Sequence, residues 1–446
     1  MRTTDNPSRL QSLDLPDDLA AIAVRPGEPR YGAVRHTYTR LGSPGAVLLV
    51  RDAHDIGAAL AHARAAQLPL TVRSGGHGIS GRSTNVGGIV VDLSQLGTVE
   101  VLESGLVRVA AGARWGEVAA ALAPYGMAIS SGDTGDVGVG GLATAGGIGL
   151  MSRLHGLTID HIRAAEVVLA DGSVVRTDTA HDPDLFWAVR GAGANFGVAT
   201  AFEFHPAQVR EVTAAVTVYD ASDPAAFLTR WGAAVEAAPR AVTSFLTLVL
   251  GPGGKAVAQA MTVYAGTDAA MVGAALAPLL AAGPVLRNQA FTTPYHQLLP
   301  ASRGLQYAQQ PLTVSRSGLL DHITPLAAEN IAGLLEVAGM VQLRSVGGAV
   351  NDTQSAAMAY SHRTQNFSLM AATVPGQGSD LDQRWDLLHP HLNGLYPSFE
   401  TRTGRQQFQD AFPGAVLDRL VTLKAHYDPD HLFDTNFALP SAPFPP

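Results

Sequence analysis

The sequence contains no cysteine among its 446 residues. A chain without thiols forms neither disulfides nor thiolate metal sites, and it has no cysteine nucleophile. Charge is also sparse, because 15% of the residues are charged, the net charge is −8, and no run of five like charges occurs. Affinity for phosphate polymers and anionic membranes depends on clustered Lys and Arg, so this balance argues against binding to nucleic acid or to a membrane surface.

Several catalytic and metal-binding motifs are missing as well. The fifteen histidines form no H-E-x-x-H pattern, the acidic residues have no EF-hand spacing, and no G-x-S-x-G elbow marks a serine nucleophile. No metal site is expected. The first twenty residues lack the apolar segment of a secretory signal, and no stretch of about 18 apolar residues predicts a membrane span. We therefore expect a soluble, cytoplasmic protein.

The chain is too long for one ordinary hydrophobic core, which predicts two domains. In the first part, apolar runs at 45–50 and 68–72 flank a segment with helical spacing at 52–66. This strand, helix, strand order is typical of α/β construction. A further strand is expected at 85–94 and a short helix at 116–126. Asp171-Gly172 between two β-branched runs predicts a hairpin over 164–177.

After about residue 207 the pattern changes. Amphipathic helices expected at 223–238 and 268–283 alternate with strands at 244–250 and 256–266. This alternation predicts a second, α+β domain in which helices cover a sheet. A helix is expected at 415–429, and 435–439 is expected to return to the first domain. The predicted divisions are 1–207, 208–414 and a C-terminal segment, 415–446.

Two glycine-rich loops stand out, Arg73–Gly81 and Ser131–Gly149. Glycine permits positive φ and lets successive backbone N–H groups converge on an anion such as a pyrophosphate. Two such loops about 60 residues apart suggest a ligand with two ends. For one loop alone a plain surface turn is the better interpretation, but for the pair it is the weaker one. No buried strand precedes the second loop, which disfavours a nicotinamide-type Rossmann unit.

Four blocks of sequence carry a resemblance to a known family. They read VRSGGHGISG, GDTGDVGVGGLATAGGIGLMSRLHGLTIDHI, DPDLFWAVRGAGANFGVATAFEF and YDPDHLFDTNF, in that order. Together they resemble the berberine-bridge-enzyme-like FAD-linked oxidases, which have the vanillyl-alcohol-oxidase or PCMH-type flavoprotein fold. The resemblance spans nearly the whole chain. It implies a two-domain α+β protein with an FAD-binding domain and a substrate domain whose antiparallel sheet is covered by helices.

The resemblance also implies how FAD is attached. His77 occupies the position of the histidine that is bonded to the flavin 8α carbon in this family, although an uncoupled His77 beside non-covalent FAD stays open. Thr134 stands where many members place a second, cysteinyl link, so a single link is expected. Val137 falls where the family controls oxygen access, and a valine there favours an oxidase over a dehydrogenase.

The same transfer, residue by residue, implies the remaining cofactor contacts. For any one of the glycines a simple tight turn is nearly as good an interpretation, and the set is more persuasive than its members. The expected cofactor-binding residues are Arg73, Ser74, Gly75, Gly76, His77, Gly78, Thr134, Val137, Gly138, Gly140, Gly141, Gly146, Gly147, Val198 and Asn436.

Tyr396 matches a position where family members use a tyrosine base, and its phenol would need a lowered pKa to act at neutral pH. Arg344, in the strand expected at 340–350, shares a face with Gln342 and Val346. Arg344 suggests either recognition of a polar or anionic substrate group or a partner that lowers the pKa of a tyrosine. That Arg344 is simply a solvated residue of the strand is about equally expected. Tyr360 and His362 form the second choice for catalysis. Tyr307 and His296 are weaker candidates.

The expected function is oxidation of an alcohol or amine carbon of a small organic molecule, with O2 as acceptor and H2O2 as product. Natural-product intermediates, cyclic amines and sugars are possible substrate classes, sugars being the least favoured. A dehydrogenase with another acceptor, or a redox-neutral cyclase or dehydratase on a flavin scaffold, are the alternatives. The sequence leaves the oligomeric state open.

Overall fold

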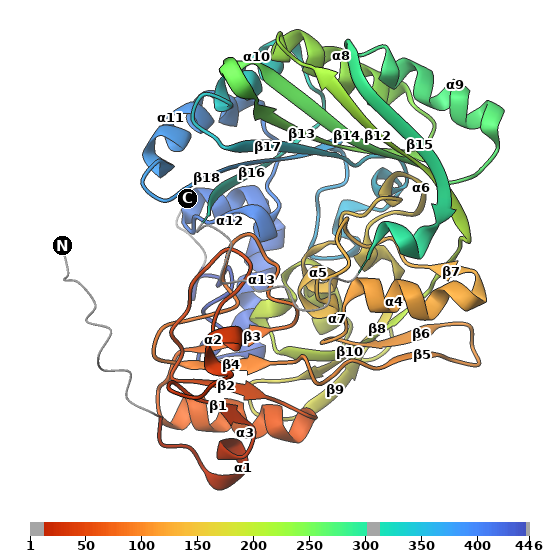
Figure 1. The fold of residues 1–446 in the computed structure, drawn as a ribbon. Coiled ribbons are helices and arrows are strands. Elements are labelled where there is room, and N and C mark those ends of the chain that lie inside the picture. Colours follow the sequence, from red (N-terminus) through yellow and green to blue (C-terminus); the bar gives the residue numbers. More distant parts are fainter. Residues whose placement is uncertain (1–12, 301–312, 443–446) are drawn as a thin grey trace.

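A computed structural model describes residues 13–300 and 313–442. The first two hundred residues form two sheets, which lie in the lower half of Figure 1. The smaller sheet has the order β1-β2-β4-β3, with β2, β4 and β3 parallel and β1 antiparallel to β2. Its strands are β1 (Ala23–Val24), β2 (Ala46–Leu49), β3 (Leu70–Arg73) and β4 (Ile89–Asp92). Helix α3 (Ala53–Ala65) joins β2 to β3 and begins at Asp52, whose side chain accepts from the Asp55 N–H. The predicted strand, helix, strand order is confirmed.

The second sheet is antiparallel, in the order β5-β6-β10-β8-β9. Its strands are β5 (Val99–Val101), β6 (Val107–Ala110), β8 (Ile162–Val168), β9 (Val174–Thr177) and β10 (Val198–Phe204). The hairpin predicted over 164–177 is confirmed by the pairing of β8 with β9, and Gly172 has a φ of 89° in its turn. A two-stranded ladder pairs β7 (Met127–Ala128) with β11 (Ala207–Gln208).

Short helices connect these strands and lie around the two sheets (Figure 1). The helix predicted at 116–126 is observed as α4, followed by a single 3-10 turn that ends at Gly126 in the left-handed conformation. The helices of this part are α1 (Asp17–Ala20), α2 (Tyr31–Val34), α4 (Trp115–Leu122), α5 (Val139–Ala145), α6 (Ser152–His155) and α7 (Pro183–Ala192).

A seven-stranded antiparallel sheet forms the other part, in the order β15-β12-β14-β13-β17-β18-β16. Helices cover its outer face, as Figure 1 shows, which confirms the predicted architecture. The strands are β12 (Glu211–Asp220), β13 (Val242–Leu250), β14 (Ala256–Tyr264), β15 (Val285–Pro294), β16 (Val314–Leu320), β17 (Met340–Ser345) and β18 (Phe367–Thr373). The helices are α8 (Pro224–Ala237), α9 (Ala269–Leu280), α10 (Pro325–Leu334) and α11 (Gly378–Leu388).

The seven-stranded sheet lies between two hydrophobic cores, and successive side chains along a strand point into one core or the other. On β13, Phe245 packs into the first core, which includes the two N-terminal sheets, whereas Leu246 and Leu248 pack into the second core beneath the covering helices. The central strand β13 is therefore buried on both faces over most of its length, whereas the edge strand β15 is largely exposed. The inner face of the sheet looks towards the first part of the chain.

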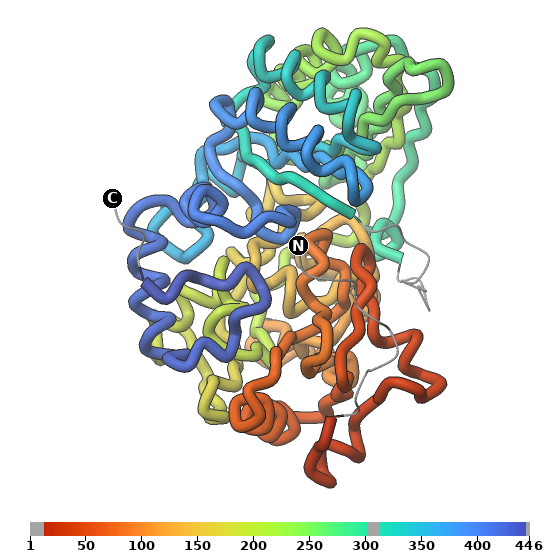
Figure 2. The backbone as a smooth tube through the Cα atoms, turned by 90° about the vertical axis from the view of Figure 1, so that its left-hand side faces the viewer, coloured from red at the N-terminus to blue at the C-terminus, as the bar shows by residue number. Residues whose placement is uncertain are grey.

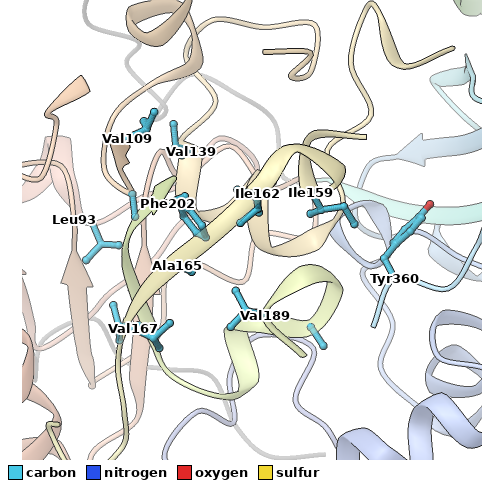
Figure 3. Packing of buried hydrophobic residues seen from close by; sticks show 14 of the residues in the cluster. Leu93, Val109, Val139, Ile159, Ile162, Ala165, Val167, Val189, Phe202 and Tyr360 are labelled. Atoms are coloured by element: carbon cyan, nitrogen blue, oxygen red, sulfur yellow. The ribbon is translucent and has the colours of Figure 1, made fainter. Parts of the chain in front are cut away.

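Figure 3 shows part of the first core, where Val109, Val139 and Phe202 pack together. This core also takes in residues that we expected in the second domain. Met358, Phe408 and Phe412 belong to it, while the second core ends at Leu388. The chain thus packs against the first core before helix α12 (Arg405–Ala411), and the division at 414 stays a prediction.

The C-terminal segment runs beside the first part of the chain (Figure 2), as predicted for 435–439. Thr435 Oγ1 donates to the Leu70 carbonyl at 2.8 Å, and the Asn195 side chain accepts from the Leu439 N–H at 3.0 Å. Helix α13 (Ala415–Tyr427) carries Lys424, whose ammonium is buried and 2.5 Å from Asp428 Oδ2. The same ammonium donates to the carbonyls of Asn195 and Phe433. This network fixes the segment that follows the helix.

Replacing Lys424 with Met should destabilise the fold by about 3–5 kcal/mol, because it leaves the Asp428 carboxylate buried without its cation. Urea unfolding followed by circular dichroism measures the change. Arg240→Met is the control, since Arg240 and Asp352 form an ion pair in which both side chains are exposed, and its unfolding midpoint should stay near that of the parent. Equal midpoints for the two variants would contradict a supporting role for Lys424.

Candidate functional site

A cavity of about 690 Å³ lies where the two glycine loops face the inner side of the seven-stranded sheet. Three parts of the chain contribute many of its lining residues. The first loop contributes Ser74–Gly78, the second contributes residues such as Gly132, Thr134 and Val137, and the strands β17 and β18 contribute Gln342 and Met370. A smaller cavity of about 70 Å³ shares Ser74 and Asn436 with it. Sites of this kind commonly measure about 300–1,000 Å³, so the larger cavity has the size of a cofactor site.

The two glycine loops touch through their backbones. A Cβ on Gly75 would stand 2.3 Å from the Gly138 nitrogen, and a Cβ on Gly138 would stand 2.1 Å from the Gly75 nitrogen. Only glycine permits so close an approach at both positions. Ser74 joins the loops further, since its hydroxyl donates to the Ala111 carbonyl at 2.6 Å and accepts from the Gly140 N–H at 3.3 Å.

His77 lies in the wall of the cavity, and the Tyr38 ring stacks on it with centroids 5.0 Å apart and planes 17° apart. Burial, and then the nearby positive charge of Arg114, lower the pKa of His77 to about 4. The imidazole is therefore neutral at physiological pH. A neutral ring keeps a lone pair on one nitrogen, which bond formation to carbon requires.

Most of the expected cofactor residues line one of the two cavities. The larger cavity is lined by Ser74, Gly75, Gly76, His77, Gly78, Thr134, Val137, Gly138, Gly141 and Asn436. Gly140 and Val198 line the smaller one. The motifs of the resemblance thus lie around two cavities that share lining residues.

Three of the expected cofactor residues line neither cavity. Arg73 lines neither cavity; its guanidinium is buried, pairs with Asp92 at 2.7 Å and donates to the His36 carbonyl. A buried guanidinium needs a carboxylate, and the β3/β4 register sets Arg73 opposite Asp92. Gly146 and Gly147 also lie outside both linings, because they pack against side chains instead of facing the cavity.

Gly146 makes room for the Tyr396 ring, and Gly147 binds its hydroxyl. A Cβ on Gly146 would come within 2.8 Å of the Tyr396 ring, and the Gly147 N–H donates to the Tyr396 hydroxyl at 2.9 Å. Tyr396 lines the cavity, as expected for a residue that meets substrate. Burial raises its pKa above the usual value, and the Gly147 N–H and the charge of Arg344 oppose that shift without reversing it. The lowered pKa that a neutral-pH base needs is therefore not found.

The second pair of catalytic candidates lies behind Tyr396. Tyr360 contacts the Tyr396 ring edge to face at 6.1 Å, and His362 Nε2 lies 3.0 Å from the Ala411 carbonyl. Neither lines a cavity, and His296 does not either. Burial lowers the pKa of His362 to about 4. These side chains support the packing around Tyr396, and a catalytic role for Tyr360 and His362 stays a prediction. Tyr307 lies outside the described residues.

Arg344 is buried rather than solvated. It projects from β17 into the cavity wall, and its guanidinium donates to Asp133 Oδ2 at 3.2 Å. Gln342 lines the cavity on the same face. Val346, expected on that face too, follows the end of the strand and packs in the first core.

Sequence reasoning missed Tyr38 and Asp133. Tyr38 lies outside every motif, so only the fold reveals that it stacks on His77. Asp133 stands beside Thr134 in the second glycine loop, and a carboxylate at that position was a signal that could have been followed. Among residues 13–300 and 313–442, no group of three acidic or histidine side chains could hold a metal ion, and no helix is long and apolar enough to cross a membrane.

Comparison with known proteins defines the class. Residues 44–178 match a family model described as an FAD binding domain. The fold matches the carbohydrate oxidase from Microdochium nivale, with a TM-score of 0.82 and 25% identity over 95% of this chain and 99% of that one. It also matches the glucooligosaccharide oxidase from Acremonium strictum, with a TM-score of 0.83 and 22% identity over 96% and 99% of the chains.

In sequence, the chain is 41% identical over 162 residues to the FAD-dependent monooxygenase FUP4 of Fusarium proliferatum, which covers 36% of this chain and 31% of that protein. The match thus spans about a third of the relative's length. The chain has the two-domain fold of FAD-linked oxidases, which confirms the predicted fold class. It contains an FAD binding domain, which confirms the predicted cofactor.

The residues of the site fit FAD. Neutral His77 lies in the wall, and Gly141 of the second loop leaves space where a side chain would stand, since a Cβ there would meet nothing within 4 Å. The acidic side chains of the lining lie beside cations: Asp133 is 3.2 Å from Arg344, and Asp136 is 4.0 Å from Arg114. Because each of these carboxylates has a cation beside it, the lining does not repel the diphosphate of FAD.

Gly138→Ala should reduce the amount of FAD that purifies with the protein at least tenfold. The new Cβ would overlap the Gly75 nitrogen and push apart the two loops that hold the cofactor. The ratio of absorbance at the flavin band to absorbance of the protein measures the loss. Gly97→Ala is the control, because its Cβ would have no neighbour within 4 Å, and it should retain its flavin. Full flavin content in Gly138→Ala would contradict the role given to this contact.

Proposed function

We propose that the protein is an FAD-linked oxidase that removes a hydride from an alcohol or amine carbon of a small organic substrate, with O2 as acceptor and H2O2 as product. One observation carries the proposal: a single cavity joins the loops of an FAD binding domain to a wall that contains Tyr396 and Arg344. A substrate on that wall would lie against the cofactor. The two structural neighbours are named as oxidases, in line with this reaction.

FAD supplies the hydride acceptor when it is bound. The chain's own residues position the substrate and handle the proton. Tyr396 Oη, which accepts from the Gly147 N–H, is the group we assign to take the proton from the substrate OH or NH. Val137 lines the cavity as a small apolar side chain, and we propose that it leaves the path for O2 open.

We further propose that FAD is joined covalently to His77 and nowhere else. The glucooligosaccharide oxidase from Acremonium strictum carries a 6-S-cysteinyl, 8α-N1-histidyl FAD, which is attached at two points. This chain has a neutral histidine in the cavity wall and no cysteine at all, with Thr134 in the second loop. A single anchor follows. Tyr38, stacked on the imidazole, would hold the ring in one orientation for that bond.

A second candidate function is oxygen insertion, because the relative FUP4 is named a monooxygenase. The two reactions differ in the fate of O2. An oxidase releases one H2O2 for each O2 consumed, whereas a monooxygenase places one oxygen atom in the product. A dehydrogenase would need another acceptor, and a redox-neutral cyclase would consume no O2.

The purified protein should release H2O2 in a one-to-one ratio to the O2 consumed when it is screened against alcohols, cyclic amines and sugars. An oxygen electrode and a peroxidase-coupled dye measure the two quantities. With ¹⁸O-labelled O2, the product should carry no label. Labelled product would favour the monooxygenase, and anaerobic turnover with unbleached flavin would favour the redox-neutral alternative.

Tyr396→Phe should lower kcat/KM by about 10²–10⁴-fold, the usual contribution of a positioned acid or base. Because the pKa of Tyr396 is raised, only a small fraction of Tyr396 is phenolate at neutral pH. As long as the pH is below the pKa, this fraction increases tenfold for each unit by which the pH rises. The parent kcat/KM should therefore rise from pH 7 to 10, and the variant should lack this rise. Identical pH profiles for the two proteins would remove Tyr396 as the base.

A further inference from the structure

Arg344 lies in the part of the cavity wall that is formed by the seven-stranded sheet. Its side chain is 10% exposed, projects from β17 and lies 3.2 Å from Asp133 of the second glycine loop. The neighbouring wall is largely apolar, since Met340, Met370 and Ala372 line it together with Gln342. A guanidinium in such a wall is conspicuous because a buried charge is costly unless something binds it.

Two aromatic rings hold the guanidinium in place. Its central carbon lies 4.5 Å from the Phe399 ring centroid and 5.4 Å from that of Phe245. Phe245 is directly opposite Arg344 in the β13/β17 ladder, so the backbone itself sets this contact. Stacking on ring faces fixes a guanidinium without using its N–H groups, which stay in its plane and free to donate.

The hydrogen-bonding capacity of Arg344 exceeds what the described residues use. A guanidinium has five N–H donors, and among residues 13–300 and 313–442 it makes one hydrogen bond, to Asp133 Oδ2 at 3.2 Å. Asp133 is the more exposed partner, at 30% of its side chain. One carboxylate oxygen thus orients the guanidinium and leaves donors for a second acceptor.

Arg82, the other arginine that lines the cavity, has both of its terminal nitrogens engaged by the protein and is not available to a substrate. Arg82 donates to the carbonyls of Pro397, Glu400 and Arg402, and these bonds hold the loop that follows Tyr396. Its guanidinium is thus engaged by backbone, whereas that of Arg344 faces the substrate wall.

We propose that Arg344 is a specificity-determining residue that binds a carboxylate on a mainly apolar substrate. The inference rests on the proposed function, because it places the substrate against the β17 and β18 wall of the same cavity. A planar carboxylate accepts two parallel N–H bonds from a guanidinium, and the methionines accommodate an apolar body. A neutral sugar would find too few polar partners on this wall, so an organic acid is the better fit.

The test compares phenylacetate with phenylacetamide, a neutral probe of nearly the same shape, by isothermal titration calorimetry on the flavin-loaded protein. Phenylacetate should bind at least tenfold more tightly. Arg344→Met should bind both probes equally, and Arg344→Lys should retain part of the preference because it keeps a charge but loses the planar fork. Arg240→Met removes an exposed surface charge far from the cavity and should leave the preference unchanged.

Equal affinities in the parent protein, no measurable phenylacetate binding, or a preference that persists in Arg344→Met would overturn the inference. So would tighter binding of phenethylamine than of phenylacetate, lost in Asp133→Asn, since the site would then select amines through Asp133. The proposed function fails separately: a flavin-loaded protein that releases no H2O2 with any substrate would refute the oxidase, while the carboxylate preference is still read from the titration.

Discussion

The contact between Gly75 and Gly138 is the constraint on which the site depends. Because neither residue has a side chain, the two loops meet backbone to backbone, and Ser74 adds hydrogen bonds across the same junction. That junction brings His77 and Val137 into one cavity although they are 60 residues apart in sequence. The sheet of the second part closes the cavity from the other side, and the C-terminal segment adds Asn436 to its wall.

The features that sequence reasoning predicted are those set by local patterns. Alternation and helical spacing predicted the strand, helix, strand unit around α3, and Asp171-Gly172 predicted the hairpin of β8 and β9. The glycine loops were recognisable because glycines cluster where backbone must approach a ligand or another loop. The resemblance then gave the order of the motifs, and it predicted that Asn436 and Tyr396 would lie in the same site as His77.

The features that were missed depend on which distant segments meet. Arg73 belongs to a cofactor motif, yet a strand register that no local pattern encodes pairs it with Asp92. Gly146 is part of a glycine block, but the neighbour that requires it is the Tyr396 ring, about 250 positions later in the sequence. The raised pKa of Tyr396 follows from burial, which appears only when both cores are assembled.

The mass of the proteolytic peptide that contains His77 tests the central claim most directly, namely that this cavity holds FAD through a single bond to that histidine. In the purified parent protein, the peptide should be heavier by one FAD, less the two hydrogens lost on bond formation, and fragmentation should locate the addition at His77. No other peptide should carry flavin. An unmodified His77 peptide from yellow protein, or flavin on a different residue, would contradict the account.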